Sequence, residues 1–255
     1  MKQNTSRIAL ITGASRGLGR SVAMHLATQD VGIVATYLEQ SAAAEELVGG
    51  IKARGGRAVA LQLDVGDTPS FGAFAQRLER ALADTWQRDR FDFLVNNAGH
   101  GVHAAFAQTT EADFDRLMRV HLKGPFFLTQ AMLPLLADGG RIVNFSSGLA
   151  RFTFPGYAAY ATMKGGLEVM SRYMARELAA RAITVNVIAP GAIETDFGGG
   201  AVRDNAQLNA QLAAATALGR VGLPDDVGAA VAALLGDGNR WVTGQRIEVS
   251  GGMML

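Results

Sequence analysis

Residues 7–19 read RIALITGASRGLG, and this stretch decides the fold that we expect. It opens with a short, mostly apolar run typical of a buried strand, and a helical pattern follows over residues 20–27. Between them lie Gly13, Gly17 and Gly19. Glycines let the backbone turn tightly and approach a phosphate, and the free N–H groups at a helix start attract an anion. The stretch predicts a pyrophosphate cradle; a simple strand-to-helix turn is the alternative.

The rest of the chain repeats this alternation of short apolar runs and longer helical patterns. We expect seven strands, near residues 7–11, 31–36, 58–63, 91–95, 142–145, 183–188 and 245–249. One intervening helix is predicted to begin with Thr68 as its N-cap, and another to begin with a capping box at Thr110 and to bend at Gly124-Pro125. The alternation predicts an α/β protein whose mainly parallel sheet carries helices on both faces. No linker or repeat interrupts residues 1–255, so we expect a single domain.

Charge and composition exclude several classes of function. The net charge is +1 and the basic residues are scattered, so nucleic acid is not indicated. The absence of cysteine excludes disulfides, thiol catalysis and cysteine-bound zinc, and fits a reducing compartment. No apolar run approaches the ~18–20 residues that cross a bilayer, and a strand beginning near Ile8 leaves no room for a signal peptide. We therefore expect a cytoplasmic protein without membrane contact.

A second informative stretch, residues 142–166, predicts a buried strand, a loop and a helix that carries Tyr160 and Lys164. Residues four apart on a helix share one face, with Cβ atoms about 5–6 Å apart. An ammonium group that close would lower the tyrosine pKa from about 10 by at most about three units. Tyr160 would then exchange protons near neutral pH. The alternative is a half-exposed tyrosine beside a solvated lysine on a surface helix.

Together these motifs resemble the classical short-chain dehydrogenase/reductase family over nearly the whole chain. The matching landmarks are Thr12 to Gly19, Asp64-Val65, Asn96-Asn97-Ala98-Gly99, Ser147 with Tyr160 and Lys164, Pro190-Gly191 with Thr195, and Thr243-Gly244-Gln245 through Gly251-Gly252. The resemblance implies a Rossmann-type, doubly wound domain, a nicotinamide cofactor and a small-molecule carbonyl or alcohol substrate. It also implies a homo-oligomer, either a tetramer or a dimer.

The resemblance assigns the catalytic roles to three residues. Ser147 lies thirteen residues before Tyr160, which is the separation that the family uses, and the neighbouring Ser146 should face away because strand side chains alternate. Ser147 and Tyr160 would hydrogen-bond the substrate oxygen, and Tyr160 would donate its proton. Lys164 would lower the Tyr160 pKa and hold the nicotinamide ribose.

The resemblance also implies a set of cofactor-binding residues. These are Thr12, Gly13, Ser15, Arg16, Gly17, Leu18, Gly19, Tyr37, Asp64, Val65, Asn97, Ala98, Gly99, Tyr160, Lys164, Pro190, Gly191, Ile193 and Thr195. Asp64 would bind the adenine amino group, and Ile193 and Thr195 the carboxamide. An acidic residue at the end of the second strand would repel a 2′-phosphate, but the chain has Tyr37 and Leu38 there and its nearest acid is Glu39. Arg16 is placed to bind such a phosphate. NADP(H) is therefore favoured, and NAD(H) remains the alternative if Arg16 only covers the adenine or points to solvent.

Histidines mark the chief departure from the family pattern. The family commonly has Val-Asn-Leu-Lys-Gly where residues 120–124 read Val-His-Leu-Lys-Gly, and the Asn helps hold a water in a proton relay. His121 would support that relay by titrating near neutrality, or would be neutral while its backbone carbonyl holds the water. His100 and His103 lack a third ligand for zinc, so we expect no metal and place them in the wall of the substrate cleft.

The C-terminal third is less specific. Residues 196–217 include Gly198-Gly199-Gly200 and are expected to form a flexible lid over the substrate. Trp241 and Met253-Met254-Leu255 are apolar and indicate either subunit contact or core packing.

Three classes of function remain open for the chain. The leading one is an NADP-dependent reductase or dehydrogenase, with a 3-oxoacyl-carrier-protein reductase as a narrower version that would need a basic docking patch. A catalytically silent NADP sensor has no need of the three catalytic residues. A methyltransferase would lack the Tyr-x-x-x-Lys helix.

Overall fold

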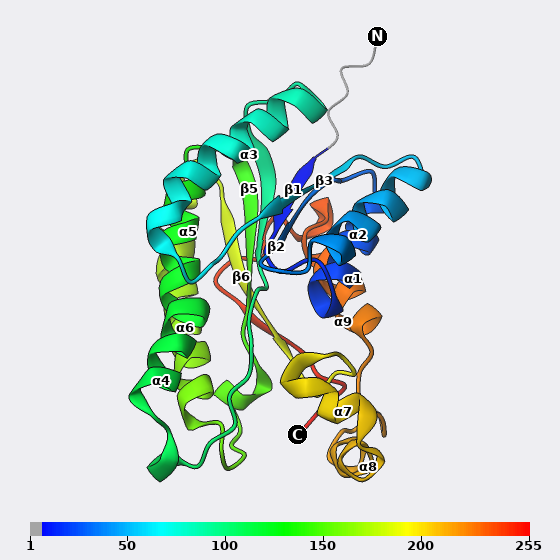
Figure 1. Cartoon of the computed structure of the whole chain (residues 1–255), viewed down its shortest axis with the longest axis vertical. Coiled ribbons are helices and arrows are strands. Elements are labelled where there is room, and N and C mark those ends of the chain that lie inside the picture. Colours follow the sequence, from blue (N-terminus) through cyan, green and yellow to red (C-terminus); the bar gives the residue numbers. More distant parts are fainter. Residues whose placement is uncertain (1–6) are drawn as a thin grey trace.

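The computed structural model describes residues 7–255, which form a seven-stranded sheet with helices on both faces (Figure 1). The strands are β1 Ile8–Ile11, β2 Gly32–Tyr37, β3 Ala58–Gln62, β4 Phe91–Asn96, β5 Leu136–Phe145, β6 Thr184–Pro190 and β7 Arg246–Val249. They lie in the order β3-β2-β1-β4-β5-β6-β7, and every neighbouring pair is parallel. The strand order reverses between β1 and β4, which is where open parallel sheets bind ligands. The predicted doubly wound α/β fold is confirmed.

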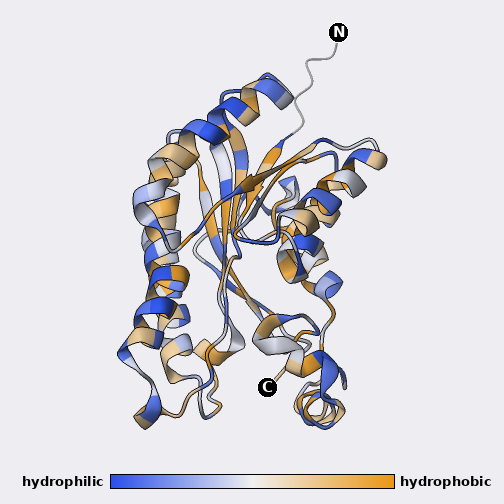
Figure 2. Cartoon of the chain, viewed as in Figure 1, coloured by the Kyte–Doolittle hydropathy of each residue, from blue (hydrophilic) through white to orange (hydrophobic). Residues whose placement is uncertain are grey.

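Two groups of helices cover the sheet. One face carries α1 Gly17–Ala27, α2 Ser41–Ala53 and α9 Pro224–Leu234, and the other carries α3 Phe71–Trp86, α4 Glu111–Met118, α5 Gly124–Met132 and α6 Ala158–Glu177 (Figure 1). Each group packs an apolar stripe against the strands, so the sheet lies between two separate cores. Apolar residues accordingly gather along the strands and the inward helix faces in Figure 2. Packing on both faces explains why the strands read as continuous apolar runs.

Of the two N-caps predicted from the sequence, Thr110 is confirmed and Thr68 is wrong. The hydroxyl of Thr110 accepts the backbone N–H of Asp113 at 3.1 Å, which confirms Thr110 as the N-cap of α4. Thr68 is not an N-cap. It is the first residue of a short 3₁₀ turn, Thr68–Ser70, and α3 begins only at Phe71. Pro69 suits this turn because its fixed φ favours the first turn of a helix.

The bend expected at Gly124-Pro125 takes the form of a π-helical turn, Arg119–Lys123, directly before it. Pro125 has no N–H, so it cannot bond the carbonyl of His121 four residues earlier. Gly124 passes against the Val65 carbonyl so closely that a Cβ there would collide with it. The widened turn places the His121 side chain inside the protein.

The predicted lid segment, residues 196–217, is largely helical. It contains the 3₁₀ turn Phe197–Gly200 and the helices α7 Ala201–Asp204 and α8 Ala206–Ala214. Asn209 anchors it, because its amide donates to the Glu194 carboxylate at 2.8 Å and to the Val202 carbonyl at 2.9 Å. Within residues 7–255, none of the helices is both long and apolar enough to span a membrane.

Candidate active site

A cavity of about 530 Å³ opens at the carboxyl ends of the strands and collects nearly all the predicted site residues. Of these residues, only Thr12 and Gly19 do not line it. Thr12 is buried, and its hydroxyl accepts the N–H groups of Asn97 and Ala98, each at 3.0 Å. A Cβ on Gly19 would lie 2.5 Å from the Asn97 amide nitrogen. Both residues therefore hold the β1 and β4 loops together behind the cavity wall.

The glycine turn has the geometry of an anion cradle. Gly13 and Gly17 have φ of +64° and +55°, a backbone region in which side chains are strained. Arg16 is the N-cap of α1, but its backbone is extended and its side chain makes no capping bond. The first turn of α1 also contains no acidic residue. Its N–H groups and the positive end of the helix dipole fit the pyrophosphate of a dinucleotide.

Arg16, in this turn, lines the cavity together with Tyr37 and Leu38 at the end of β2. Its side chain is 63% exposed and lies 3.7 Å from Asp196, measured from Nη1 to Oδ2. That separation is long for an ion pair, so the guanidinium group is loosely held. On the same side, Asp64 accepts the N–H of Gly66 at 2.7 Å.

Tyr160, Lys164 and Ser147 meet at the end of β5. Tyr160 and Lys164 are 7% and 5% exposed, which rules out the solvated surface pair considered from the sequence. The Lys164 Nζ donates to the Phe145 carbonyl at 2.6 Å and lies 5.5 Å from the centre of the Tyr160 ring. Ser147 lies beside Tyr160, and its hydroxyl accepts the N–H of Leu149 at 3.2 Å. Ser146 points away and donates to Glu168 at 2.6 Å, which confirms the predicted alternation.

Burial controls the protonation of this pair. It raises the pKa of Tyr160 above its ordinary value, although the Ser147 hydroxyl beside it acts in the opposite direction. It also lowers the pKa of Lys164 to about 7. The expectation that Lys164 lowers the tyrosine pKa is therefore wrong, because the buried site disfavours both the ammonium and the phenolate. Tyr160 is a neutral O–H donor at physiological pH.

His121 is 1% exposed and packs edge-on against Tyr160, with ring centres 5.2 Å apart. Its Nε2 lies 2.7 Å from the His100 carbonyl oxygen, whereas its Nδ1 is buried without a hydrogen-bond partner. Burial, followed by the charge of Lys164, holds the pKa of His121 well below its usual value. These observations favour the neutral imidazole, with Nε2–H donating and Nδ1 left as an acceptor. Gly99 makes room for the ring, since a Cβ there would lie 2.6 Å from His121 Cε1.

The remaining part of the cavity has an aromatic wall that the sequence reading missed. Its residues are Leu149, Phe152, Phe154, Tyr157, Phe197, Val202, Leu212 and Met253. The Phe197 ring, from the lid, lies 5.8 Å from the Tyr160 ring. The signal in the sequence is the aromatic spacing in residues 152–157, Phe-Thr-Phe-Pro-Gly-Tyr, a stretch that is predicted only as a loop between strand and helix.

The remaining histidines and the C-terminal apolar residues lie in different environments. His100 lines the cavity as predicted, but His103 packs beside it against Tyr157, with ring centres 5.0 Å apart. In the described part of the chain, no group of three or more His, Cys, Asp or Glu could hold a metal ion. Met253 is 3% exposed and lines the cavity, whereas Trp241 and Leu255 remain exposed.

Comparisons with known proteins show the family of the chain. Residues 13–254 match a family model described as enoyl-(acyl carrier protein) reductase. The hydroxynaphthalene reductase-like protein Arp2 of Metarhizium brunneum is 35% identical over 96% of this chain and 94% of its own. The chain belongs to the short-chain dehydrogenase/reductase family.

Two solved structures share the fold over nearly their whole length. The promiscuous reductase LugOII, which catalyses keto-reduction at C1 during lugdunomycin biosynthesis, superposes with a TM-score of 0.93 at 39% identity and covers 100% of both chains. The angucycline C-6 ketoreductase LanV, crystallised with NADP, also gives a TM-score of 0.93, at 36% identity, covering 98% of this chain and 97% of its own.

Proposed function

We propose that the protein is an NADP(H)-dependent ketoreductase that reduces a ketone on a fused aromatic ring system, with Tyr160 as the acid. The observation that carries the proposal is the uncharged, aromatic-walled half of the cavity, which ends on Ser147 and Tyr160. Flat aromatic walls favour a flat aromatic ligand, because stacked rings add about 0.5–1.5 kcal/mol per pair beyond their buried area. The names of Arp2, LugOII and LanV support the same substrate class.

The bound nicotinamide would supply the hydride, and the residues of the chain would supply position and the proton. Ser147 and Tyr160 hydrogen-bond the carbonyl oxygen, on which negative charge develops. Tyr160 then gives its proton to that oxygen, so the hydride on carbon and the proton on oxygen complete the alcohol. Lys164, with a pKa of about 7, returns a proton to the tyrosinate. In the oxidation direction the same groups work in reverse.

Arg16 and the end of β2 support NADP(H) over NAD(H). The last residue of β2, Tyr37, and the next residue, Leu38, carry no carboxylate that would repel a 2′-phosphate, and the nearest acid is Glu39, two positions after the strand. The loosely held guanidinium of Arg16 can turn to bind that phosphate through two oxygens. LanV, with its bound NADP, supports the same preference.

We further propose that residues 1–255 act as one catalytic domain and that residues 196–217 move as its lid. A cytoplasmic location and assembly as a tetramer or dimer remain predictions from the sequence. The description of the family model favours one second candidate, reduction of a thioester-linked substrate on a carrier protein. The candidate substrates therefore include enoyl and 3-oxoacyl thioesters.

The deciding experiment follows the loss of NADPH absorbance with tetralones, hydroxynaphthoquinones and the two kinds of thioester. We expect turnover of the fused-ring compounds and a loss of about 10²–10⁴-fold in kcat for Tyr160→Phe. Titrations should show that both proteins bind NADPH equally, which separates lost chemistry from lost folding. Preferential turnover of thioesters would contradict the proposed substrate class. Tight NADPH binding without any turnover would instead favour the silent sensor.

A further inference from the structure

The end of the chain forms part of the cavity. Met253 lines the cavity and pairs in an isolated β-bridge with Thr216, at the end of the lid. The Met254 N–H donates to the Ala215 carbonyl at 3.0 Å, and the Leu218 N–H donates to the Gly251 carbonyl at 3.0 Å. The last residues therefore connect the lid to the substrate half of the site.

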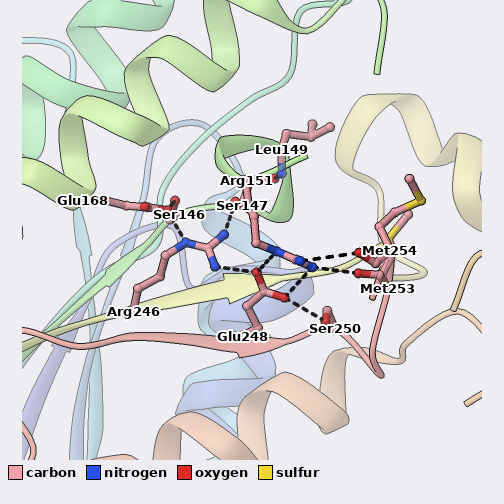
Figure 3. A network of polar contacts seen from close by, with 10 residues as sticks. All are labelled: Ser146, Ser147, Leu149, Arg151, Glu168, Arg246, Glu248, Ser250, Met253 and Met254. Atoms are coloured by element: carbon pink, nitrogen blue, oxygen red, sulfur yellow. Dashed lines mark hydrogen bonds and ion pairs between the residues drawn. The ribbon is translucent and has the colours of Figure 1, made fainter. Parts of the chain in front are cut away.

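Arg151 holds this tail in place (Figure 3). Its Nη2 donates to the Met253 carbonyl at 2.9 Å, and its Nη1 to the Met254 carbonyl at 3.4 Å. The same guanidinium forms a fork with Glu248, with distances of 2.6 Å and 3.1 Å to the two carboxylate oxygens. Arg151 follows Ser147 by only four residues, so one short loop carries both the serine and the group that binds the tail.

Arg246 completes the network on the other side of Glu248 (Figure 3). Its Nη1 donates to Glu248 at 2.5 Å and its Nε to Glu168 at 2.7 Å. Its Nη2 donates to the backbone carbonyl of Ser147 at 3.1 Å. Glu168 in turn accepts from Ser146, so both serines at the end of β5 are held by this network.

The charges in this network balance, so each side chain depends on its partners. Two arginines face two glutamates, and the Arg246 and Glu168 side chains are largely buried. Removal of one partner from such a group leaves another charge without compensation, at a cost larger than that of one exposed ion pair. Glu248 contacts both arginines, so a displacement of Arg151 also changes the contacts of Arg246, and the reverse.

We infer that Arg246 and Arg151, bridged by Glu248, are positioning residues that orient Ser147 and fix residues 253–254 as a specificity-determining wall for the substrate. Arg246 holds the backbone at Ser147, and Arg151 holds Met253 against the cavity. Neither arginine is assigned contact with the substrate. The inference rests on the proposed ketone reduction and assigns it two further residues.

The test compares a three-ring aromatic ketone with a single-ring cyclic ketone. Arg246→Met is expected to lower kcat for both ketones by about tenfold or more, because a charged hydrogen bond is lost. KM should stay nearly unchanged. Arg246→Lys should recover part of the loss. Arg151→Met should raise KM for the three-ring ketone by about tenfold and leave the single-ring ketone within about twofold. In the double variant the losses should be less than multiplicative, because the residues share Glu248.

A matched control is Arg20→Gln, which breaks the exposed pair with Glu46, 2.8 Å long, on the other face of the sheet. It should change neither kinetic constant. Equal NADPH affinity in all variants shows that they are folded. An unchanged kcat in Arg246→Met, or equal effects of Arg151→Met on the two ketones, would overturn the inference.

Amide hydrogen exchange tests the network without turnover. Arg151→Met should accelerate exchange in residues 250–255, and Arg246→Met in residues 146–149, whereas Arg20→Gln should affect neither segment. If the wild-type protein reduces no ketone, the proposed function fails, and the exchange measurement still decides whether the network holds the tail. Unchanged exchange in both segments would show that it does not.

Discussion

The Nζ of Lys164 donates to the carbonyl oxygen of Phe145 at 2.6 Å, and this bond ties α6 to the end of β5. It satisfies one of the three donors of a lysine that burial holds at a pKa of about 7. The site thus places an amine that titrates near neutrality beside a tyrosine whose pKa burial raises.

Lys164 should make stability depend on pH. Between about pH 7 and its ordinary pKa near 10.4, the unfolded chain binds a proton at this site that the folded chain does not. This difference makes the free energy of unfolding rise with pH in that window, by at most about 1.4 kcal/mol per unit, and contributes no slope below it. Lys164→Met should remove this rise, as measured by urea unfolding between pH 6 and 9.5. Parallel curves for the two proteins would contradict the lowered pKa.

His121 should make the free energy of unfolding depend on pH on the acidic side, below about pH 6.5. Its pKa is held well below 6.5, so below that pH the unfolded chain takes up a proton that the folded chain refuses. The wild-type free energy of unfolding should therefore fall as the pH drops from about 6.5 to 5, and His121→Asn should show a shallower fall. His103→Gln is the matched control, since His103 packs outside the cavity lining. Equal slopes in all three proteins would contradict a neutral, buried His121.

Gly99 and His121 should be coupled energetically. The Cβ of Gly99→Ala would lie 2.6 Å from a buried ring, so we expect a loss of about 1–3 kcal/mol of stability. Adding His121→Asn should recover much of that loss, giving a clear interaction energy in a double-mutant cycle. The comparison is Gly50→Ala in α2, where the added Cβ would have no neighbour within 4 Å. This change should stabilise the protein by up to about 1 kcal/mol. Additive effects of the Gly99 and His121 changes would show that the ring moves aside freely.

Arg16 should set the cofactor preference. Arg16→Ala is expected to weaken NADPH binding by about tenfold or more and NADH binding by much less, because only NADPH carries the 2′-phosphate. Asp196→Asn removes the carboxylate 3.7 Å away and should leave NADPH affinity equal or higher. Fluorescence titration of each variant with both nucleotides measures this. An equal loss for NADPH and NADH after Arg16→Ala would assign the residue to adenine packing.

Much of the fold and site could be predicted because the deciding signals are local. The glycine turn after β1, the alternation of apolar runs and helical patterns, and the capping residue Thr110 depend on neighbours in the sequence. The spacing of Tyr160 and Lys164 placed them on one helix face. The start of α3 was misplaced because propensities of adjacent residues do not distinguish a 3₁₀ turn from the first turn of an α-helix.

The sequence by itself determined the order of the elements and the glycine turn after β1, since these follow from backbone preferences and residue spacing, and its resemblance to a family proposed the reacting side chains. Only the tertiary structure decided the protonation of Tyr160 and Lys164, the neutral environment of His121 and the place of Met253 in the cavity wall. The physical reason is that burial and long-range contacts set these properties. Desolvation depends on what covers a group, and residues far apart in the chain supply that cover.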